Sequence, residues 1–235
     1  EYVVAGTRFG GPVPQRDISI DDYKGNFKGA LSFIKIDQKT GEMNLEFQIM
    51  MPGFDYDKAH PGRGKSHGWM FFTTYNVEES NTLLEVNASQ RDKDFIAAVN
   101  WKKAEEYLQS GKYTTMKTKY AHNVYDEHTQ SAVSTMKTEV KILDPKDCPG
   151  LVYFLPMPKS PHGCDIDPSG EYIVGSGKLS ANVTVHSFSN MIKAIDKEKF
   201  DGEAYGIPII SFEDVLAGVV KQPGLGPLHT EFDDK

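Results

Sequence analysis

Alternating apolar and polar residues run through most of the chain and predict a fold built from β-strands. An alternation with a period of two places every second side chain on the same face of a strand. It occurs at residues 1–5, 30–36, 43–50, 68–74, 135–143, 172–175 and 182–188. Turn signals at 36–42 and 166–171 each carry a glycine where a hairpin needs a positive φ. The pattern therefore favours antiparallel sheets joined by tight turns.

Helical signals are fewer than strand signals. Residues 100–111 contain good helix formers and end at a glycine, whereas 189–199 and 211–221 each begin with a serine that can cap a helix. Residues 112–134 show neither periodicity, and we expect them to be irregular. Many short strands with regular turns and inserted helices are typical of a β-propeller or a β-sandwich. No linker divides the chain, so residues 1–235 are interpreted as one domain.

Composition narrows the class of partner. Hydrophobic residues make up 39% of the 235 residues, which is enough for a packed core. The 26 basic residues are outnumbered by 33 acidic ones and form no basic stripe, which argues against a nucleic-acid partner. No apolar run approaches the ~18 residues that a membrane-spanning helix needs. The chain starts in mid-strand without a methionine and stops within a turn signal, so we expect an internal fragment of a longer protein.

A weak internal repeat singles out two histidines. Residues 161–170 and 227–235 each contain a proline, a histidine one or two residues later, and a turn with aspartate. In a propeller, such segments begin the innermost strand of a blade, and equivalent positions of different blades face one axis. We therefore expect His162 and His229 to point at the same spot across the 67 residues that separate them (229 − 162). A metal shared by imidazoles would be copper or zinc rather than magnesium or calcium.

Ordinary structural roles remain the alternative for histidines. His186 lies in a strand pattern and is interpreted as structural, and the others lie in polar, loop-like sequence: His60, His67, His122 and His128. Two cysteines, at 148 and 164, leave open a disulfide or two thiols. Acidic residues cluster after Tyr75, where they offer the oxygen ligands that a hard cation needs or simply form a solvated face: Glu78, Glu79, Glu85, Asp92 and Asp94.

Two segments resemble the nitrous oxide reductase family. Residues 156–180, with Pro-His-Gly-Cys at 161–164, and residues 224–233, with Gly-Pro-Leu-His at 226–229, are similar to two segments of that family's N-terminal propeller, in the same order and with a similar gap. The opening residues 2–14 also resemble a strand pair of the family. The interval between the two histidines is filled by residues 191–220, which look like a helical insertion, and this is similar to the atypical branch of the family.

The resemblance implies both a fold and an activity. The fold is all-β, a partial seven-bladed β-propeller with short helical insertions, and a C-terminal cupredoxin domain lies outside the chain. The activity is that of a copper-dependent oxidoreductase, which reduces N2O to N2 and water in the last step of denitrification. Its four-copper sulfide cluster is held by seven histidines, and His162 and His229 match two of them.

The resemblance also implies partners. Electrons come from a donor such as a cytochrome c or a cupredoxin, through a dinuclear copper centre in the partner subunit of a periplasmic homodimer. One chain therefore does not complete a site, and we expect the fragment alone to be inactive.

A calcium ion near the cluster is a further implication. Tyr75-Asn-Val-Glu78 and Arg91-Asp92 resemble the family's calcium segment, so Tyr75, Glu78 and Asp92 are the candidate ligands, with a carbonyl near Val86. The family has asparagine where this chain has Ser160. Carboxylates near the histidines are candidates for orienting them: Asp165, Asp167 and Asp233. Two other functions stay open, a calcium-binding propeller scaffold and a propeller hydrolase, both without the copper cluster.

Overall fold

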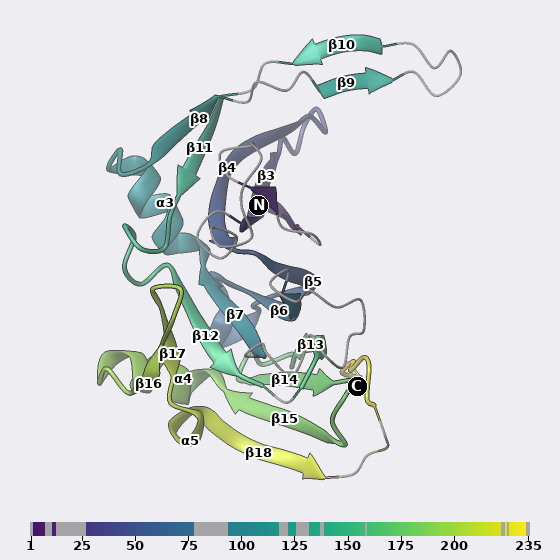
Figure 1. Cartoon of the computed structure of the whole chain (residues 1–235), viewed down its shortest axis with the longest axis vertical. Helices are drawn as coiled ribbons and strands as arrows, with labels where there is room; N and C mark the ends of the chain where they lie inside the picture. The colour runs from purple at the N-terminus through teal and green to yellow at the C-terminus, as the bar shows by residue number, and fades with distance from the viewer. Residues whose placement is uncertain are drawn as a thin grey trace.

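A computed structural model of the chain consists mainly of strands (Figure 1). The structure describes residues 2–7, 11–12, 27–77, 94–117, 122–125, 132–136, 139–157, 159–221, 224 and 226–233. Within these residues, the all-β class predicted from the sequence is confirmed.

The strands form three larger sheets and one hairpin. The first sheet has the order β1 (Tyr2–Gly6), β3 (Phe27–Ile36), β4 (Met43–Pro52), β11 (Glu139–Leu143), β8 (Thr114–Lys117), with β2 (Gly11–Pro12) on β3. The second has the order β5 (Phe54–Pro61), β6 (Trp69–Val77), β7 (Phe95–Asn100), β12 (Val152–Pro156), β17 (Ile207–Ile210), β16 (Phe200–Ala204). The third has the order β13 (Pro161–Ile166), β14 (Tyr172–Gly177), β15 (Asn182–Ser187), β18 (Leu216–Lys221). The hairpin joins β9 (His122–Tyr125) and β10 (Ala132–Met136).

The second and third sheets are built by the same succession of elements. Three antiparallel strands come first, and a helix follows the third strand directly: α3 (Trp101–Gln109) after β7 and α4 (Phe188–Asp196) after β15. The last strand residue caps each helix, because the Asn100 and Ser187 side chains accept hydrogen bonds from the amides of Lys103 and Asn190. The chain then returns to supply the fourth strand, β12 or β18.

Each helix is followed by further strands before the chain returns to the sheet that it left. These inserted strands pair with the sheet that comes earlier in the sequence. β11 pairs in parallel with β4 of the first sheet, and β17 pairs in parallel with β12 of the second. Each insertion therefore ties two neighbouring sheets together at their outer edges. This interlocking repeat, rather than the likeness between 161–170 and 227–235, is the repeat that the structure displays.

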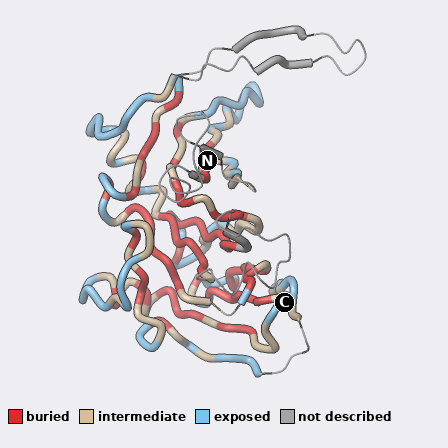
Figure 2. Tube along the Cα trace, viewed as in Figure 1, coloured by how far each residue is buried: buried red, intermediate tan, exposed pale blue. Residues whose placement is uncertain are grey.

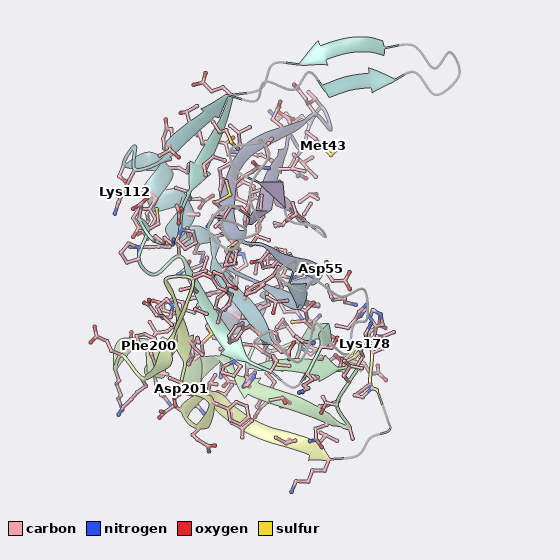
Figure 3. All side chains as sticks on the ribbon, in the orientation of Figure 1. Met43, Asp55, Lys112, Lys178, Phe200 and Asp201 are labelled. Carbon is pink, nitrogen blue, oxygen red and sulfur yellow. The ribbon has the colours of Figure 1, made fainter. Side chains whose placement is uncertain are left out.

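The first strands of neighbouring sheets meet on one side of the molecule. β5 contacts both β1 and β13, and the outer strands β8 and β16 lie on the opposite side (Figure 1). In Figure 3 the labelled Asp55 and Lys178 lie on the side of the first strands, whereas Lys112 and Asp201 lie on the far side. Functional groups on first strands of different sheets are thereby brought close together.

Two clusters of buried apolar side chains pack neighbouring sheets against each other. The first packs Phe33 and Phe47 with Phe54 and Phe154, and the second packs Phe71 with residues of the third sheet and α4, including Ile166, Ile173 and Met191. Buried residues accordingly follow the middle of the sheets, and exposed ones follow their outer edges (Figure 2).

Most predicted elements are confirmed. The predicted strands correspond to β1, β3, β4, β6, β14 and β15, and the hairpin glycines Gly41 and Gly170 both have a φ of 74°. The single strand predicted at 135–143 is instead the end of β10 and the whole of β11, which belong to different sheets. The prediction of a helix over 211–221 is wrong beyond Val215, because α5 (Phe212–Val215) gives way to β18, which pairs with β15. The prediction that 112–134 is irregular is wrong too, since this stretch contains β8, β9 and the start of β10.

The two cysteines do not form a disulfide. Cys148 and Cys164 are buried free thiols, so the alternative of two thiols holds, and burial raises the pKa of each thiol. Among the described residues, no helix is both long and apolar enough to cross a membrane.

His186 is a buried core histidine, as its strand pattern predicts. Its Nε2 lies 3.0 Å from the Pro156 carbonyl oxygen, and its ring packs edge-on against Phe212. Burial lowers the pKa of His186 from 6.5 to about 4, although the hydrogen bond to Pro156 acts in the opposite direction.

Acidification should therefore destabilise the protein through His186. The unfolded chain takes up this proton near pH 6.5 and the folded chain only near pH 4, so stability is lost as pH falls through this window. We expect the urea midpoint of the wild type to fall more between pH 7.5 and pH 4 than that of a His186→Phe variant. Parallel losses in the two proteins would contradict this assignment.

Candidate metal centre

His162 lies at an irregular position in the first strand of the third sheet. The register of β13 against β14 shifts between Pro161 and Gly163, so His162 is the extra residue of a bulge. A bulge redirects a side chain out of the regular alternation of a strand. Just before it, Ser160 is buried with a φ of 58°, and its carbonyl oxygen accepts a hydrogen bond from the Lys178 amide. Asparagine is favoured over serine in this left-handed conformation, which fits the residue that the family resemblance led us to expect.

His229 lies in a segment without regular secondary structure. Residues 227–233 are assigned to no strand, so the expectation that 227–235 begins an innermost strand is not met in the described residues. The segment instead runs beside β13 and β14, where the Ser176 hydroxyl donates a hydrogen bond of 3.1 Å to the Leu228 carbonyl oxygen. The structure thus places His229 beside the bulge that carries His162.

The two imidazoles contact each other. Their ring centroids are 4.8 Å apart and their planes are inclined at 81°. Strand β13 and the segment that follows β18 thus bring together two rings that are remote in the sequence.

Gly163 makes this approach sterically feasible. A Cβ atom at position 163 would lie 2.6 Å from the Leu228 carbonyl oxygen and 3.0 Å from the Cα atom of His229. Because both neighbours are backbone atoms, they cannot move aside as a flexible side chain would. A glycine directly after His162 is therefore needed for the segment of His229 to lie this close.

A carboxylate from the second sheet orients His162. The Oδ2 atom of Asp57, on β5, lies 2.8 Å from His162 Nε2. Nε2 therefore faces the Asp57 carboxylate, and Nδ1 is the ring nitrogen that points away from it. Asp57 carries no sequence signal for this role, because its contact depends on the packing of β5 against β13.

The carboxylates that we expected to orient the histidines have other contacts. Asp165 accepts hydrogen bonds from the amides of Ile166 and Phe232, and its Oδ1 lies 2.7 Å from His60 Nε2. Asp167 accepts hydrogen bonds from Ser169 and Tyr172 in its own turn. A role for Asp233 beside His229 stays a prediction.

The predicted calcium ligands lie largely beyond what the structure describes. Tyr75 belongs to β6 through its backbone, and Glu78, Val86 and Asp92 fall in 78–93, outside the described residues. Among the described residues, no group of three or more His, Cys, Asp or Glu side chains is arranged to hold a metal ion. The two imidazoles fit a copper or zinc centre in donor type, but as part of a larger set of ligands.

Fold and site together define an all-β protein of interlocked, mainly antiparallel sheets with a pair of contacting imidazoles. No family model matches the chain. The chain is 28% identical over 239 residues to the nitrous-oxide reductase of Stutzerimonas stutzeri and 26% identical over 238 residues to that of Pseudomonas fluorescens, covering 100% of this chain in both cases. The nitrous-oxide reductase of Cupriavidus necator is 27% identical over 99% of the chain.

These similarities confirm the family resemblance seen in the two histidine segments. The chain is similar to these nitrous-oxide reductases over 99–100% of its length. It spans about a third of the length of these curated relatives, 31% in each case.

Proposed function

We propose that this chain is part of a nitrous-oxide reductase and supplies His162 and His229 to its copper centre. The contact between the two rings, whose centroids are 4.8 Å apart, carries the proposal. Imidazole suits copper, and two imidazoles held by the neighbouring backbone are part of a ligand set that needs further ligands. The relatives named nitrous-oxide reductase support the reaction, reduction of N2O to N2 and water.

The architecture supports a β-propeller as the fold of the complete protein. Each of the sets β5–β6–β7–β12 and β13–β14–β15–β18 is a four-stranded antiparallel sheet, as a propeller blade requires. The first strands of neighbouring sheets are in contact, as strands around a central axis are. Seven such blades would bring the first residues of every sheet toward the axis where His162 and His229 lie.

The residues of this chain prepare the centre by holding imidazoles. Asp57 fixes the ring of His162 so that Nδ1 faces away from the carboxylate, and Gly163 allows the backbone of His229 to approach. When bound, a copper–sulfide cluster would supply the electrons for reduction of N2O. Because His162 lies on a packed strand and hydrogen bonds hold the segment of His229 beside it, little ordering is required at each turnover.

The remaining parts of the proposal follow from the family. They are calcium bound by Tyr75, Glu78 and Asp92, a dinuclear copper centre outside this chain, and a periplasmic homodimer that takes electrons from a cytochrome c or a cupredoxin. The residues proposed for calcium stay a prediction, because Glu78 and Asp92 lie outside the described residues.

Metal analysis and turnover of the full-length protein test this function. We expect copper in the purified protein and N2O-dependent oxidation of a reduced viologen dye. A folded protein that takes up calcium but no copper, and does not consume N2O, would contradict the reductase and favour a scaffold. The wild type without added N2O is the control for background oxidation of the dye.

A further inference from the structure

A second histidine–carboxylate contact crosses between β5 and β13, beside that of His162 with Asp57. His60 Nε2 lies 2.7 Å from Asp165 Oδ1. His60 follows Asp57 by three residues on β5, and Asp165 follows His162 by three residues on β13. Each strand thus contributes one imidazole and one carboxylate, and the contacts are reciprocal. The proposed copper centre gives a role to only one of these two pairs.

Asp165 connects three parts of the chain through its carboxylate. Asp165 is 6% exposed, so water satisfies little of the hydrogen-bonding capacity of its carboxylate. Oδ1 accepts a hydrogen bond of 2.9 Å from the Ile166 amide in addition to the contact with His60, and Oδ2 accepts one of 2.9 Å from the Phe232 amide. The carboxylate therefore joins β5 and β13 to the segment that carries His229.

The Phe232 contact matters because residues 227–233 adopt no regular secondary structure. A segment outside a ladder is held by individual contacts with its surroundings. Ser176 binds the Leu228 carbonyl oxygen directly before His229, and Asp165 binds the Phe232 amide three residues after it. The two hydrogen bonds enclose His229, and the Asp165 contact has the stronger, charged acceptor.

His60 is itself fixed at both ring nitrogens. Its Nδ1 lies 2.8 Å from the Pro61 carbonyl oxygen, and its Nε2 lies 2.7 Å from Asp165 Oδ1. The ring is thereby set with Nε2 toward Asp165. His60 thus restricts Asp165 to the rotamer in which Oδ2 meets the Phe232 amide.

We propose that Asp165, held by His60, is a positioning residue that docks residues 226–233 and thereby sets His229 against His162. Its consequence for copper rests on the proposed function, whereas the docking is a property of the chain itself.

Hydrogen exchange in the copper-free full-length protein tests the docking. We expect Asp165→Ala to raise the exchange rate of peptides covering 226–233 about tenfold, because the Phe232 amide loses a charged acceptor. Asp165→Asn should retain part of the protection, since its amide oxygen can still accept from Phe232, although its NH2 group then faces the Ile166 amide. The matched control is Asp201→Ala, which removes a carboxylate of β16, on the second sheet, that accepts from the Phe212 amide of α5.

Unchanged exchange of 226–233 in Asp165→Ala, or a rise no larger than in Asp201→Ala, would overturn the proposal. Should Asp165→Ala fail to fold, His60→Ala provides the same test. His60 is partly exposed, so its removal should cost less stability. We expect a smaller rise of exchange at 226–233 in this variant, and no rise would contradict the role of the pair.

Copper loading supplies a second readout that separates the two proposals. We expect Asp165→Ala to alter the visible absorption spectrum of the copper-loaded protein and Asp165→Asn to restore it. A wild type that binds no copper would refute the proposed function and leave the exchange result as the test of docking. Normal copper spectra in Asp165→Ala, despite wild-type copper binding, would refute the positioning of His229.

Discussion

Replacing His229 with alanine is expected to abolish N2O reduction by the full-length protein. The variant removes one of two contacting imidazoles from the proposed centre, whose rings lie 4.8 Å apart. Loss of residues that only orient metal ligands typically costs 10–100-fold in metal affinity or activity, so loss of a ligand should cost at least about a hundredfold. Turnover with a reduced viologen and copper per chain measure the effect, and His162→Ala should behave in the same way.

A surface histidine provides the matched control for these variants. His67 is exposed and its ring packs edge-on against Trp101, at 5.5 Å between centroids. We expect His67→Ala to keep wild-type copper content and turnover. His229→Ala should also keep its circular dichroism, because residues 227–233 form no strand. Wild-type copper and turnover in His229→Ala would rule out a ligand role for this residue.

The largest loss of stability is expected from Phe154→Ala. Phe154 is fully buried in β12, its ring stacks on Phe95 at 4.6 Å, and Phe54 lies 5.8 Å away. Removing a buried phenylalanine costs the transfer free energy of the ring and leaves a cavity, about 3–5 kcal/mol in total. Loss of this ring weakens the cluster that packs the first sheet on the second.

Chemical unfolding measures the effect of Phe154→Ala. We expect the free energy of unfolding to fall by about 3–5 kcal/mol, whereas Met43→Ala, at a residue that is 65% exposed, should change it little. Equal effects of the two substitutions would show that the Phe154 cluster does not hold the sheets together.

Strands with one buried face could be predicted from the sequence, whereas strands buried on both faces could not. β3 and β4 alternate apolar and polar residues because one face is covered, and their pattern identifies them. β7 and β12 are buried along nearly their whole length and have no alternation to detect. β18 was predicted as a helix because the serine at 211 signals a cap, yet pairing with β15 prevails after Val215.

The histidine pair could be expected from the sequence, but the groups around it could not. Proline-preceded histidines at two strand-like starts pointed to His162 and His229, and the structure brings their rings into contact. Asp57 and His60 gave no signal, and His60 was assigned to loop-like sequence although it lies in β5. Their contacts arise from packing of β5 against β13, which joins residues more than 100 positions apart (162 − 57 and 165 − 60).

The interlocking of sheets explains why the site has its shape. Because β11 and β17 extend the preceding sheets, each sheet is tied to its neighbour at the outer edge as well as through the core. The inner strands are thereby kept in register across the contact between sheets. The contact of Asp57 with His162 depends on that register. Pairing at the outer edges of the sheets therefore also holds the side chains at their inner strands in place.

Anomalous diffraction at the copper edge from crystals of the full-length protein tests the central claim most directly. If His162 and His229 share a copper centre, a copper peak will lie about 2 Å from a ring nitrogen of each residue. Copper bound elsewhere, with these two rings free of metal, would contradict the claim.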